Sequence, residues 1–326
     1  MSLPTFADVE AAAERIAPYA VRTPLIENAD LNARMGGRIL IKTETLQRTG
    51  SFKFRGAVNT VLQIPPARRG QGVVAFSSGN HAQGVAAAAK AFGLPATIVM
   101  PKDAPEPKVA GTRRLGAEIV FYDRATDDRE AIAREIVTRT GATLIEPFDN
   151  AKVIAGQGTI GLEIAADLHG APLDAVLVPC GGGGLVSGIA LALATAAPGA
   201  KVFAVEPERF DGMGRSLAEG QRTAAGGGSP SIADALMAPR PGEIPFALAK
   251  KHLAGALCIT DAELERAVSY ASQRLKLVVE PGGAAALAAL LAGKFDTKNK
   301  TVAVVLTGAN CELSTVARCC ETFADP

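Results

Sequence analysis

Apolar and polar positions along the chain alternate between two patterns. Short apolar runs with the length and composition of buried strands recur from residue 73 to residue 306. The expected strands are Val73–Phe76, Ala96–Met100, Ala117–Tyr122, Asp174–Val178, Lys201–Glu206 and Thr301–Leu306. Longer alanine-rich stretches between them predict helices, namely Asn80–Phe92, Asp127–Thr140, Lys152–Leu168, Leu185–Ala196 and Asp261–Leu275. This alternation is typical of βαβ units and predicts parallel sheets covered by helices.

The expected units fall into two groups. One group spans residues 72 to 149, the other begins at residue 150, and the first seventy residues precede both. A chain of 326 residues is also longer than one hydrophobic core usually supports. We therefore expect the α/β class, with two doubly wound lobes and mainly parallel sheets. The stretch Thr223–Pro230, rich in glycine and alanine, predicts a surface loop.

Composition points to a small-molecule ligand. The 34 basic and 33 acidic side chains nearly balance, so the chain has no strong field for nucleic acid or an anionic membrane surface. No apolar run approaches the ~20 residues that span a bilayer. The N-terminal stretch carries Asp8, Glu10 and Glu14 where a signal peptide would be basic and then apolar. We expect a cytoplasmic protein with neither a nucleic-acid nor a membrane partner.

Cysteine and histidine patterns exclude two kinds of structural site. The five cysteines are an odd number with no C-x-x-C pair, and the three histidines have no spacing typical of metal ligands. A disulfide scaffold or a structural zinc site is not expected.

Lys53 stands out because it lies between Phe52 and Phe54, after a Gly-Ser turn and at the expected start of a helix. An ammonium group in apolar surroundings loses hydration, so its pKa falls and part of it becomes a nucleophilic free amine. The alternative is a lysine whose stem covers Phe52 while its charge stays in water.

Four consecutive glycines, Gly181 to Gly184, follow an expected strand and open an expected helix. Such a turn directs backbone N–H groups toward an anion, which favours a phosphate site over a merely flexible turn. A dinucleotide fingerprint does not fit. Frames starting at Gly181 or Gly182 lack the sixth glycine, and the frame starting at Gly183 meets Leu185 at its third position.

Two further polar stretches follow expected strands. The octet from Ser77 to Gly84 offers hydroxyls, an amide and N-terminal backbone donors, which suit a carboxylate or a phenolic oxygen. Thr307 begins the second stretch. Taken singly, Ser78, Asn80 and Thr307 could each be no more than helix N-caps.

Together these stretches resemble the fold type II (tryptophan synthase β-like) pyridoxal-phosphate enzymes, specifically the serine/threonine dehydratase and serine racemase group. The resemblance covers almost the whole chain, and its markers occur in the family's order. They are residues 51–53, 77–81, 154–159 (Ile-Ala-Gly-Gln-Gly-Thr), 181–184, 206–207, 280–284 and 307–310. It implies a large cofactor-binding domain of residues 1–71 and 150–326 and a small substrate-closing domain of residues 72–149.

The resemblance also implies roles for individual residues. Lys53 forms the Schiff base with pyridoxal phosphate and later acts as general base at Cα. The glycines Gly181, Gly182, Gly183 and Gly184 hold the phosphate, and the two flanking phenylalanines, Phe52 foremost, support the ring. Asn80 contacts the ring hydroxyl, and Thr307 faces the ring nitrogen. The substrate carboxylate is bound by Ser77, Ser78, Asn80 and His81.

The implied reaction is β-elimination from a β-hydroxy amino acid such as L-threonine or L-serine, giving a 2-oxo acid and ammonia. Ser78 occupies the position of the opposite-face proton donor of serine racemases, so racemisation stays an alternative. Dehydration of 3-hydroxyaspartate, phenylserine or a hydroxyectoine-derived substrate is also open. Outside the family stand an NAD-dependent dehydrogenase and a catalytically silent amino-acid-binding protein.

Three positions depart from the family pattern or are ambiguous. Glu206 and the Phe210 carbonyl match a site for Mg²⁺ or another cation, but Gly212 replaces the expected aspartate and Asp211 comes one residue early. Glu146 replaces a common histidine, so it either disfavours acidic substrates or faces solvent. Arg129 is expected to be a surface charge, although some relatives use an arginine there to close the small lobe. We also expect a homodimer and no C-terminal regulatory domain.

Overall fold

The computed structural model of the chain describes residues 2–77, 79–104 and 106–324. Its helices are α1 (Phe6–Ile16), α2 (Ala29–Met35), α3 (Lys53–Leu62), α4 (Asn80–Ala91), α5 (Glu106–Arg114), α6 (Arg129–Thr140), α7 (Ala151–Asp167), α8 (Gly184–Ala196), α9 (Gly212–Glu219), α10 (Glu243–His252), α11 (Asp261–Tyr270), α12 (Ala285–Leu291) and α13 (Leu313–Thr322). Its strands are β1 (Leu25–Glu27), β2 (Arg38–Thr43), β3 (Val73–Phe76), β4 (Ala96–Pro101), β5 (Glu118–Tyr122), β6 (Thr143–Leu144), β7 (Ala175–Pro179), β8 (Lys201–Pro207), β9 (Leu253–Ile259) and β10 (Thr301–Leu306).

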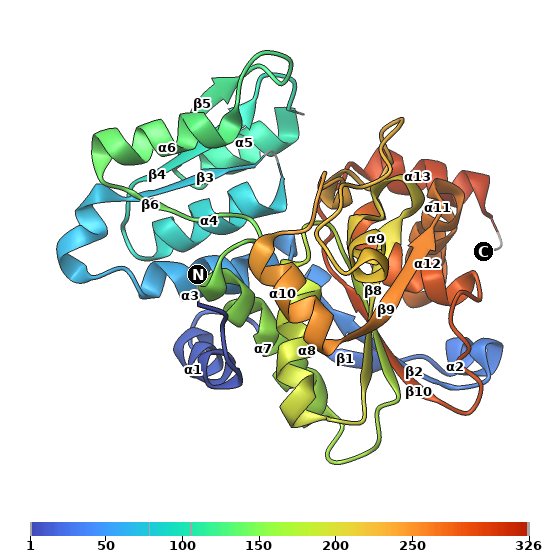
Figure 1. Cartoon of the computed structure of the whole chain (residues 1–326). Coiled ribbons are helices and arrows are strands. Elements are labelled where there is room, and N and C mark those ends of the chain that lie inside the picture. The colour runs from blue at the N-terminus through green and yellow to red at the C-terminus, as the bar shows by residue number, and fades with distance from the viewer. Residues whose placement is uncertain (1, 78, 105, 325–326) are drawn as a thin grey trace.

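The strands form two separate sheets (Figure 1). The larger has the order β1-β2-β10-β7-β8-β9, and the smaller has the order β5-β4-β3-β6. Among the named strands, β1 and β2 pair in antiparallel fashion and the other pairs are parallel. The predicted α/β class with mainly parallel sheets is therefore confirmed.

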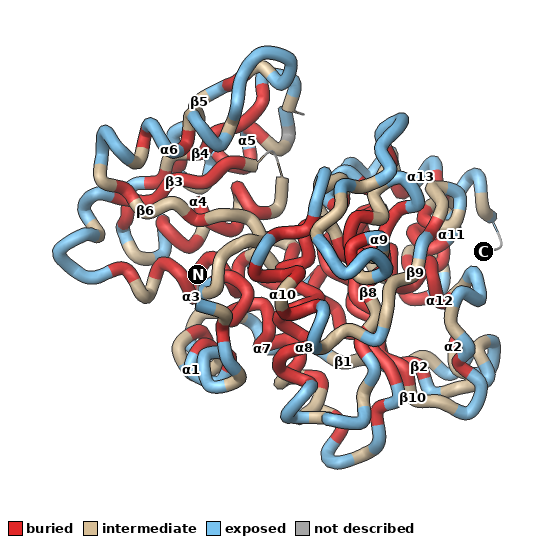
Figure 2. Tube along the Cα trace, viewed as in Figure 1, coloured by how far each residue is buried: buried red, intermediate tan, exposed pale blue. Residues whose placement is uncertain are grey.

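Helices cover both faces of each sheet because successive strand residues point to opposite faces. In β10, Val302 and Val304 enter the core beneath α11 and α12, whereas Ala303 and Val305 enter the core beneath α7 and α8. The smaller sheet does the same, with α3 and α4 on one face and α6 on the other. Figure 2 shows buried residues along the strands of both sheets and along α7 and α8.

The predicted strands all occur, with bounds shifted by at most one residue at either end. The predicted helix Asp261–Leu275 is α11 followed by one π-helical turn, Ala271–Leu275, which ends where Lys276 adopts a left-handed conformation with φ of 60°. The predicted surface loop Thr223–Pro230 has no helix or strand and is largely exposed.

The proposed domain division stays a prediction. All four strands of the smaller sheet lie within residues 72–149. Its core, however, also contains Phe54 and Ala57 from α3 and Val153 from α7. The lysine-bearing helix thus packs on the smaller sheet although it precedes that segment in sequence.

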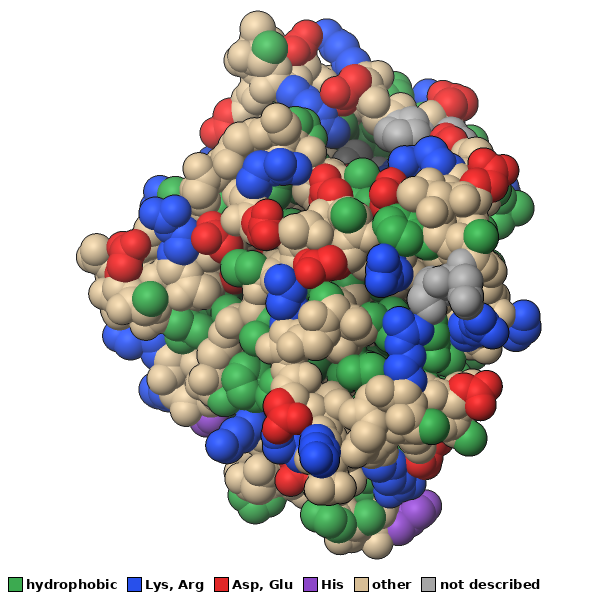
Figure 3. Space-filling model, turned by 90° about the vertical axis from the view of Figure 1, so that its right-hand side faces the viewer, with side chains coloured by type: hydrophobic (Ala, Val, Ile, Leu, Met, Phe, Trp, Pro, Cys, Tyr) green, Lys and Arg blue, Asp and Glu red, His purple; other side chains and the backbone are tan. Residues whose placement is uncertain are grey.

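The surface agrees with the balanced composition. On the face in Figure 3, lysine and arginine side chains lie interspersed with aspartate and glutamate side chains. Among the described residues, no helix is long and apolar enough to cross a membrane.

Candidate active site

A cavity of about 190 Å³ lies beyond the carboxyl ends of β3, β7 and β10. In open α/β sheets, ligands bind at the carboxyl ends of the strands. Each strand leads into one of the predicted polar stretches, and β10 pairs with β7, so two of these stretches are neighbours. The lining includes the following predicted residues: Phe52, Lys53, Ser77, Asn80, His81, Gly181, Gly182, Gly183, Gly184 and Thr307.

The first turn of α3 is fastened to the end of β10. Ser51 forms an isolated bridge with Gly308, and the Phe52 N–H donates to the Thr307 carbonyl at 3.1 Å. These bonds place the start of the helix, and with it Lys53, at the edge of the larger sheet.

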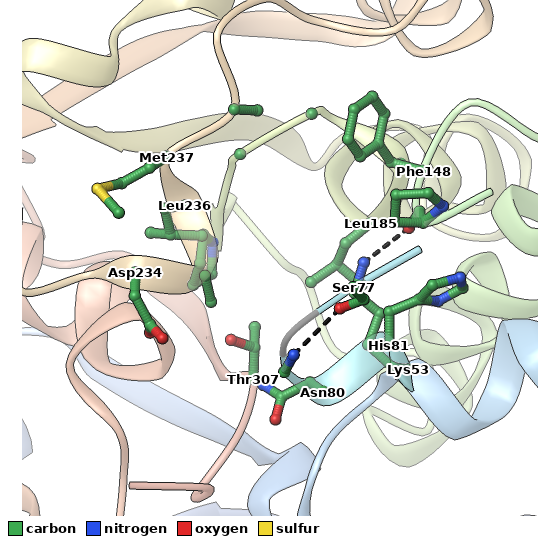
Figure 4. Close-up of a pocket in the computed structure, with 18 of the residues that line it drawn as sticks. Lys53, Ser77, Asn80, His81, Phe148, Leu185, Asp234, Leu236, Met237 and Thr307 are labelled. Atoms are coloured by element: carbon green, nitrogen blue, oxygen red, sulfur yellow. Dashed lines mark hydrogen bonds between the residues drawn. The ribbon is translucent and has the colours of Figure 1, made fainter. Parts of the chain in front are cut away.

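The Lys53 amine points into the cavity (Figure 4). It donates a hydrogen bond to the Pro147 carbonyl at 2.7 Å and lies 5.1 Å from the centre of the Phe52 ring. Burial lowers the pKa of the Lys53 amine to about 8. A charge held in bulk water is therefore the weaker interpretation. We expected both phenylalanines to support the cofactor ring. This expectation is wrong for Phe54, because Phe54 packs into the core beneath the smaller sheet.

The glycine loop forms the N-terminus of α8, whose first turn leaves backbone N–H groups without partners inside the helix. Gly183 has φ of 93°, in the left-handed region that disfavours a side chain. A Cβ there would also lie 2.5 Å from Met213 Cε. Glycine is thus required for this turn to face the cavity.

Asn80 opens α4 and is held on both sides of its amide. Its Nδ2 donates to Glu280 Oε1 at 2.6 Å, and its Oδ1 accepts from Asn310 Nδ2 at 2.8 Å. Ser77 Oγ accepts a hydrogen bond from the Gly79 N–H at 3.1 Å. These bonds hold Asn80 at the N-terminus of α4, where the positive end of the helix lies at the cavity.

His81 has a different environment from the one expected of a carboxylate ligand. Its Nε2 lies 2.7 Å from the Ile145 carbonyl, which can only accept, so Nε2 carries the proton. Its buried Nδ1 has no hydrogen-bond partner among the residues that the structure describes. Burial, with Lys53 nearby, lowers the pKa of His81 to about 3. A neutral ring with an acceptor at Nδ1 does not favour carboxylate binding through this side chain.

Comparisons with known proteins bear on this arrangement. The family model described as "Pyridoxal-phosphate dependent enzyme" matches residues 16–308. The chain belongs to this family. It is 44% identical to an L-threo-3-hydroxyaspartate ammonia-lyase of Pseudomonas sp, covering 97% of this chain and 98% of that protein. It is 41% identical to an L-threonine ammonia-lyase of Thermotoga maritima, covering 96% and 77%. The structure of maize serine racemase superposes with a TM-score of 0.92 at 32% identity and covers 99% of each chain.

This enzyme family uses pyridoxal phosphate, so the predicted family and cofactor are confirmed. The cavity fits that cofactor on three observations. An amine with a lowered pKa projects into it, the N-terminus of α8 offers N–H groups for a phosphate, and the Thr307 hydroxyl lies at its wall. The residues predicted to bind the cofactor line this one cavity, and their individual roles stay predictions.

Several lining residues carried no signal in the sequence. Lys108 on α5 donates to Asp234 Oδ2, which joins the two sides of the cavity. Asp234 to Ala238 line the wall opposite Lys53, as Figure 4 shows for Asp234, Leu236 and Met237. These segments have no motif and reach the cavity only through folding. Glu280 lay within a marker stretch, but without an assigned role.

Glu280 is buried between Asn80 and Gly308. Burial, with Asp234 adding to it, raises the pKa of the Glu280 carboxyl to about 7, while the Asn80 hydrogen bond opposes the shift. This carboxyl therefore titrates near neutral pH.

Glu206 lies at the end of β8 and does not line the cavity. Its two oxygens accept from the Met213 and Gly214 N–H groups, each at 2.8 Å, at the N-terminus of α9. The described residues contain no group of three or more His, Cys, Asp or Glu side chains that could hold a metal. These contacts are those of a hydrogen-bonded strand end, and cation binding by Glu206 stays an untested prediction.

Ser78 lies outside the described residues, so its predicted role is not addressed by the structure. Arg129 and Glu146, which were ambiguous in the sequence, can be placed. Expecting Arg129 to be a surface charge was wrong, because it lines the cavity and its guanidinium lies 5.4 Å from the centre of the Phe76 ring. Glu146 does not line the cavity, and its carboxylate accepts a hydrogen bond from Asn150 at 2.8 Å. A direct charge effect of Glu146 on the substrate is therefore not favoured.

Proposed function

We propose that the protein is an ammonia-lyase that eliminates the β-hydroxyl and the amino group of a β-hydroxy amino acid such as L-threonine or L-serine. The products are a 2-oxo acid and ammonia. The observation that carries this proposal is the Lys53 amine, whose pKa is lowered to about 8, in the same cavity as the Gly181–Gly184 loop. The ammonia-lyase names of the relatives support the same reaction.

Bound pyridoxal phosphate would supply an electron sink that makes the Cα proton of the amino acid acidic and assists departure of the β-substituent. The residues of the chain bind, orient and move protons. Lys53 would take the Cα proton, since a general base works best when its pKa lies near the working pH. The Pro147 carbonyl would orient the amine, and the N-terminus of α4 would bind the substrate carboxylate.

A second candidate substrate is a β-hydroxy amino acid with a second carboxylate, such as 3-hydroxyaspartate. Arg129 and Lys108 both line the cavity, and Lys108 already pairs with Asp234, whereas the Arg129 guanidinium rests on Phe76. Arg129 would then bind the distal carboxylate. The variant Arg129→Ala should raise KM for L-threo-3-hydroxyaspartate about tenfold or more, as expected for loss of a charged hydrogen-bond donor, and barely change KM for L-threonine.

Racemisation of serine is the remaining alternative within the family, supported by the likeness to maize serine racemase. We also propose a cytoplasmic homodimer. The five cysteines are all free, as is usual in a reducing compartment. Leu46 and Leu313 are 52% and 73% exposed, which is consistent with contact to a second chain. Light scattering would test the dimer.

One substrate panel tests the proposed reaction. Purified enzyme should release a 2-oxo acid from L-threonine, L-serine or L-threo-3-hydroxyaspartate, and Lys53→Ala should lose this activity. Lys90→Ala serves as the control because Lys90 is an exposed lysine on α4. Faster formation of D-serine than of pyruvate would make the protein a racemase, and no 2-oxo acid from any member of the panel would refute the proposal.

A further inference from the structure

Four charged side chains form a cluster in the interior beside the active site. Arg55 faces Glu44 through two parallel bonds, Nε to Oε2 and Nη2 to Oε1, each 2.8 Å. It also faces Glu163, with Nη1 to Oε1 at 2.6 Å and Nη2 to Oε2 at 2.9 Å. Lys42 Nζ completes the cluster at 2.5 Å from Glu163 Oε2. Arg55, Lys42 and Glu44 are fully buried, and two cations balance two anions.

The cluster joins three other segments to α3, the helix that carries Lys53. Lys42 lies on β2, Glu44 follows that strand, Glu163 lies on α7, and Arg55 lies in the first turn of α3. Residues two apart in a helix point about 200° apart. Arg55 therefore enters the interior on the side of α3 opposite to Lys53, which enters the cavity.

Helix α7 adds further contacts through the Ile154–Thr159 stretch, a sequence marker without an assigned role. Gln157 Oε1 accepts from the Gly56 N–H at 3.2 Å, and Thr159 Oγ1 accepts from Arg55 Nη1 at 3.2 Å. The helices touch so closely that a Cβ on Gly56 would lie 2.6 Å from Gln157 Nε2. One face of α7 thus contacts α3 at its first turn.

Stability alone does not explain such a cluster, because apolar side chains of similar volume often stabilise an interior as well as a buried ion pair. The paired bonds of a guanidinium instead fix direction. Here they fix the rotation of α3 about its axis. An extended lysine amine lies about 8 Å from its helix axis, so a rotation of about 10° moves it by about 1.4 Å. Displacements near 1 Å cost about a hundredfold in rate when catalytic geometry is demanding.

We propose that Arg55 and Glu163 are positioning residues that aim the Lys53 amine by fixing the rotation of α3. This inference rests on the proposed function of Lys53. Neither side chain lines the cavity, so both act through the helix. The Ile154–Thr159 stretch contributes to the same positioning of α3, because its Gln157 and Thr159 accept hydrogen bonds from Gly56 and Arg55.

The test compares two variants of the holoenzyme, both of which are expected to have a lowered melting temperature. Arg55→Lys keeps the positive charge but loses the paired N–H donors of the guanidinium group. Leu290→Ala, in the core on the other face of the larger sheet, is the control whose melting temperature also falls. We expect kcat of Arg55→Lys to fall tenfold or more, with KM changed less than threefold, and the visible circular dichroism of the bound cofactor to change. Leu290→Ala should keep the wild-type kcat and spectrum.

A second variant keeps the test decisive if Arg55→Lys does not fold. Glu163→Gln preserves shape and removes the charge that Arg55 and Lys42 share, and it should show the same loss of kcat and altered spectrum. If the folded variants match Leu290→Ala in kcat and spectrum, the cluster is only structural and the proposal is wrong. A wild-type enzyme with no lysine-bound cofactor would overturn both the proposal and the proposed function, so the two failures are distinguishable.

Discussion

The lowered pKa of Lys53 predicts that this lysine destabilises the cofactor-free protein. Its folded-state pKa is about 8 and its ordinary value is 10.5, because burial disfavours the charged form. A difference of about 2.5 pKa units corresponds to about 3 kcal/mol. The Pro147 hydrogen bond offsets part of this cost. Lys53→Met keeps an unbranched side chain one atom shorter and removes the charge, so we expect a gain of about 1–3 kcal/mol at pH 7.

The sign of the pH dependence follows from proton binding. Between pH 8 and 10.5 the unfolded chain binds the Lys53 proton more strongly than the folded protein does. The stability of the wild-type protein therefore rises with pH in this window relative to Lys53→Met. The full cost is present below pH 8, and the advantage of the variant disappears near pH 10.5.

Thermal unfolding of the cofactor-free proteins measures the effect. For a chain of this length about 2 kcal/mol corresponds to about 3 °C. Lys53→Met should melt about 2–4 °C above wild type at pH 7 and close to it at pH 10. Lys90→Met, at an exposed lysine, should show no such dependence. If Lys53→Met melts below wild type at pH 7, or if its gain does not change with pH, the amine is not desolvated.

Two further predictions concern the rest of the cavity. Gly183→Ala, strained by a φ of 93° and a contact with Met213, should weaken cofactor binding about tenfold or more in a cofactor titration. Gly199→Ala, where a Cβ meets nothing within 4 Å, should not. Because burial raises the pKa of Glu280 from 4.5 to about 7, its contribution to stability falls as pH rises through that window. Melting curves of Glu280→Gln should lack this decline, and a parallel decline in the variant would count against the raised pKa.

Local sequence predicted the elements whose pattern is self-contained. The strand β3 and helix α4 are an apolar run, a polar turn and an alanine-rich stretch in immediate succession, and β7 and α8 repeat this order around four glycines. β9 was missed because Ala254, Gly255 and Ala256 in its first half have low strand propensity, and pairing with β8 makes this segment a strand. Helix α10 runs into it without a break residue.

The site shows the same division between local and tertiary information. Lys53, Asn80 and the glycine loop sit at element starts, so their motifs could be read in sequence. Asp234 and Lys108 reach the cavity only because the segments that carry them fold together across it. The direction of a side chain was also beyond the sequence. Phe52, which caps α3, and Phe54, in its first turn, are two residues apart, so one lies at the cavity and the other in the core.

The most direct measurement locates the cofactor on the chain. Purified enzyme is reduced with borohydride, digested and analysed by peptide mass spectrometry, in parallel with Lys53→Ala. We expect the cofactor mass on the peptide containing Lys53, and we expect the variant to lose both this adduct and the visible absorption band. Attachment to Lys108, another lysine of the cavity wall, or retention of the adduct by Lys53→Ala would contradict this expectation.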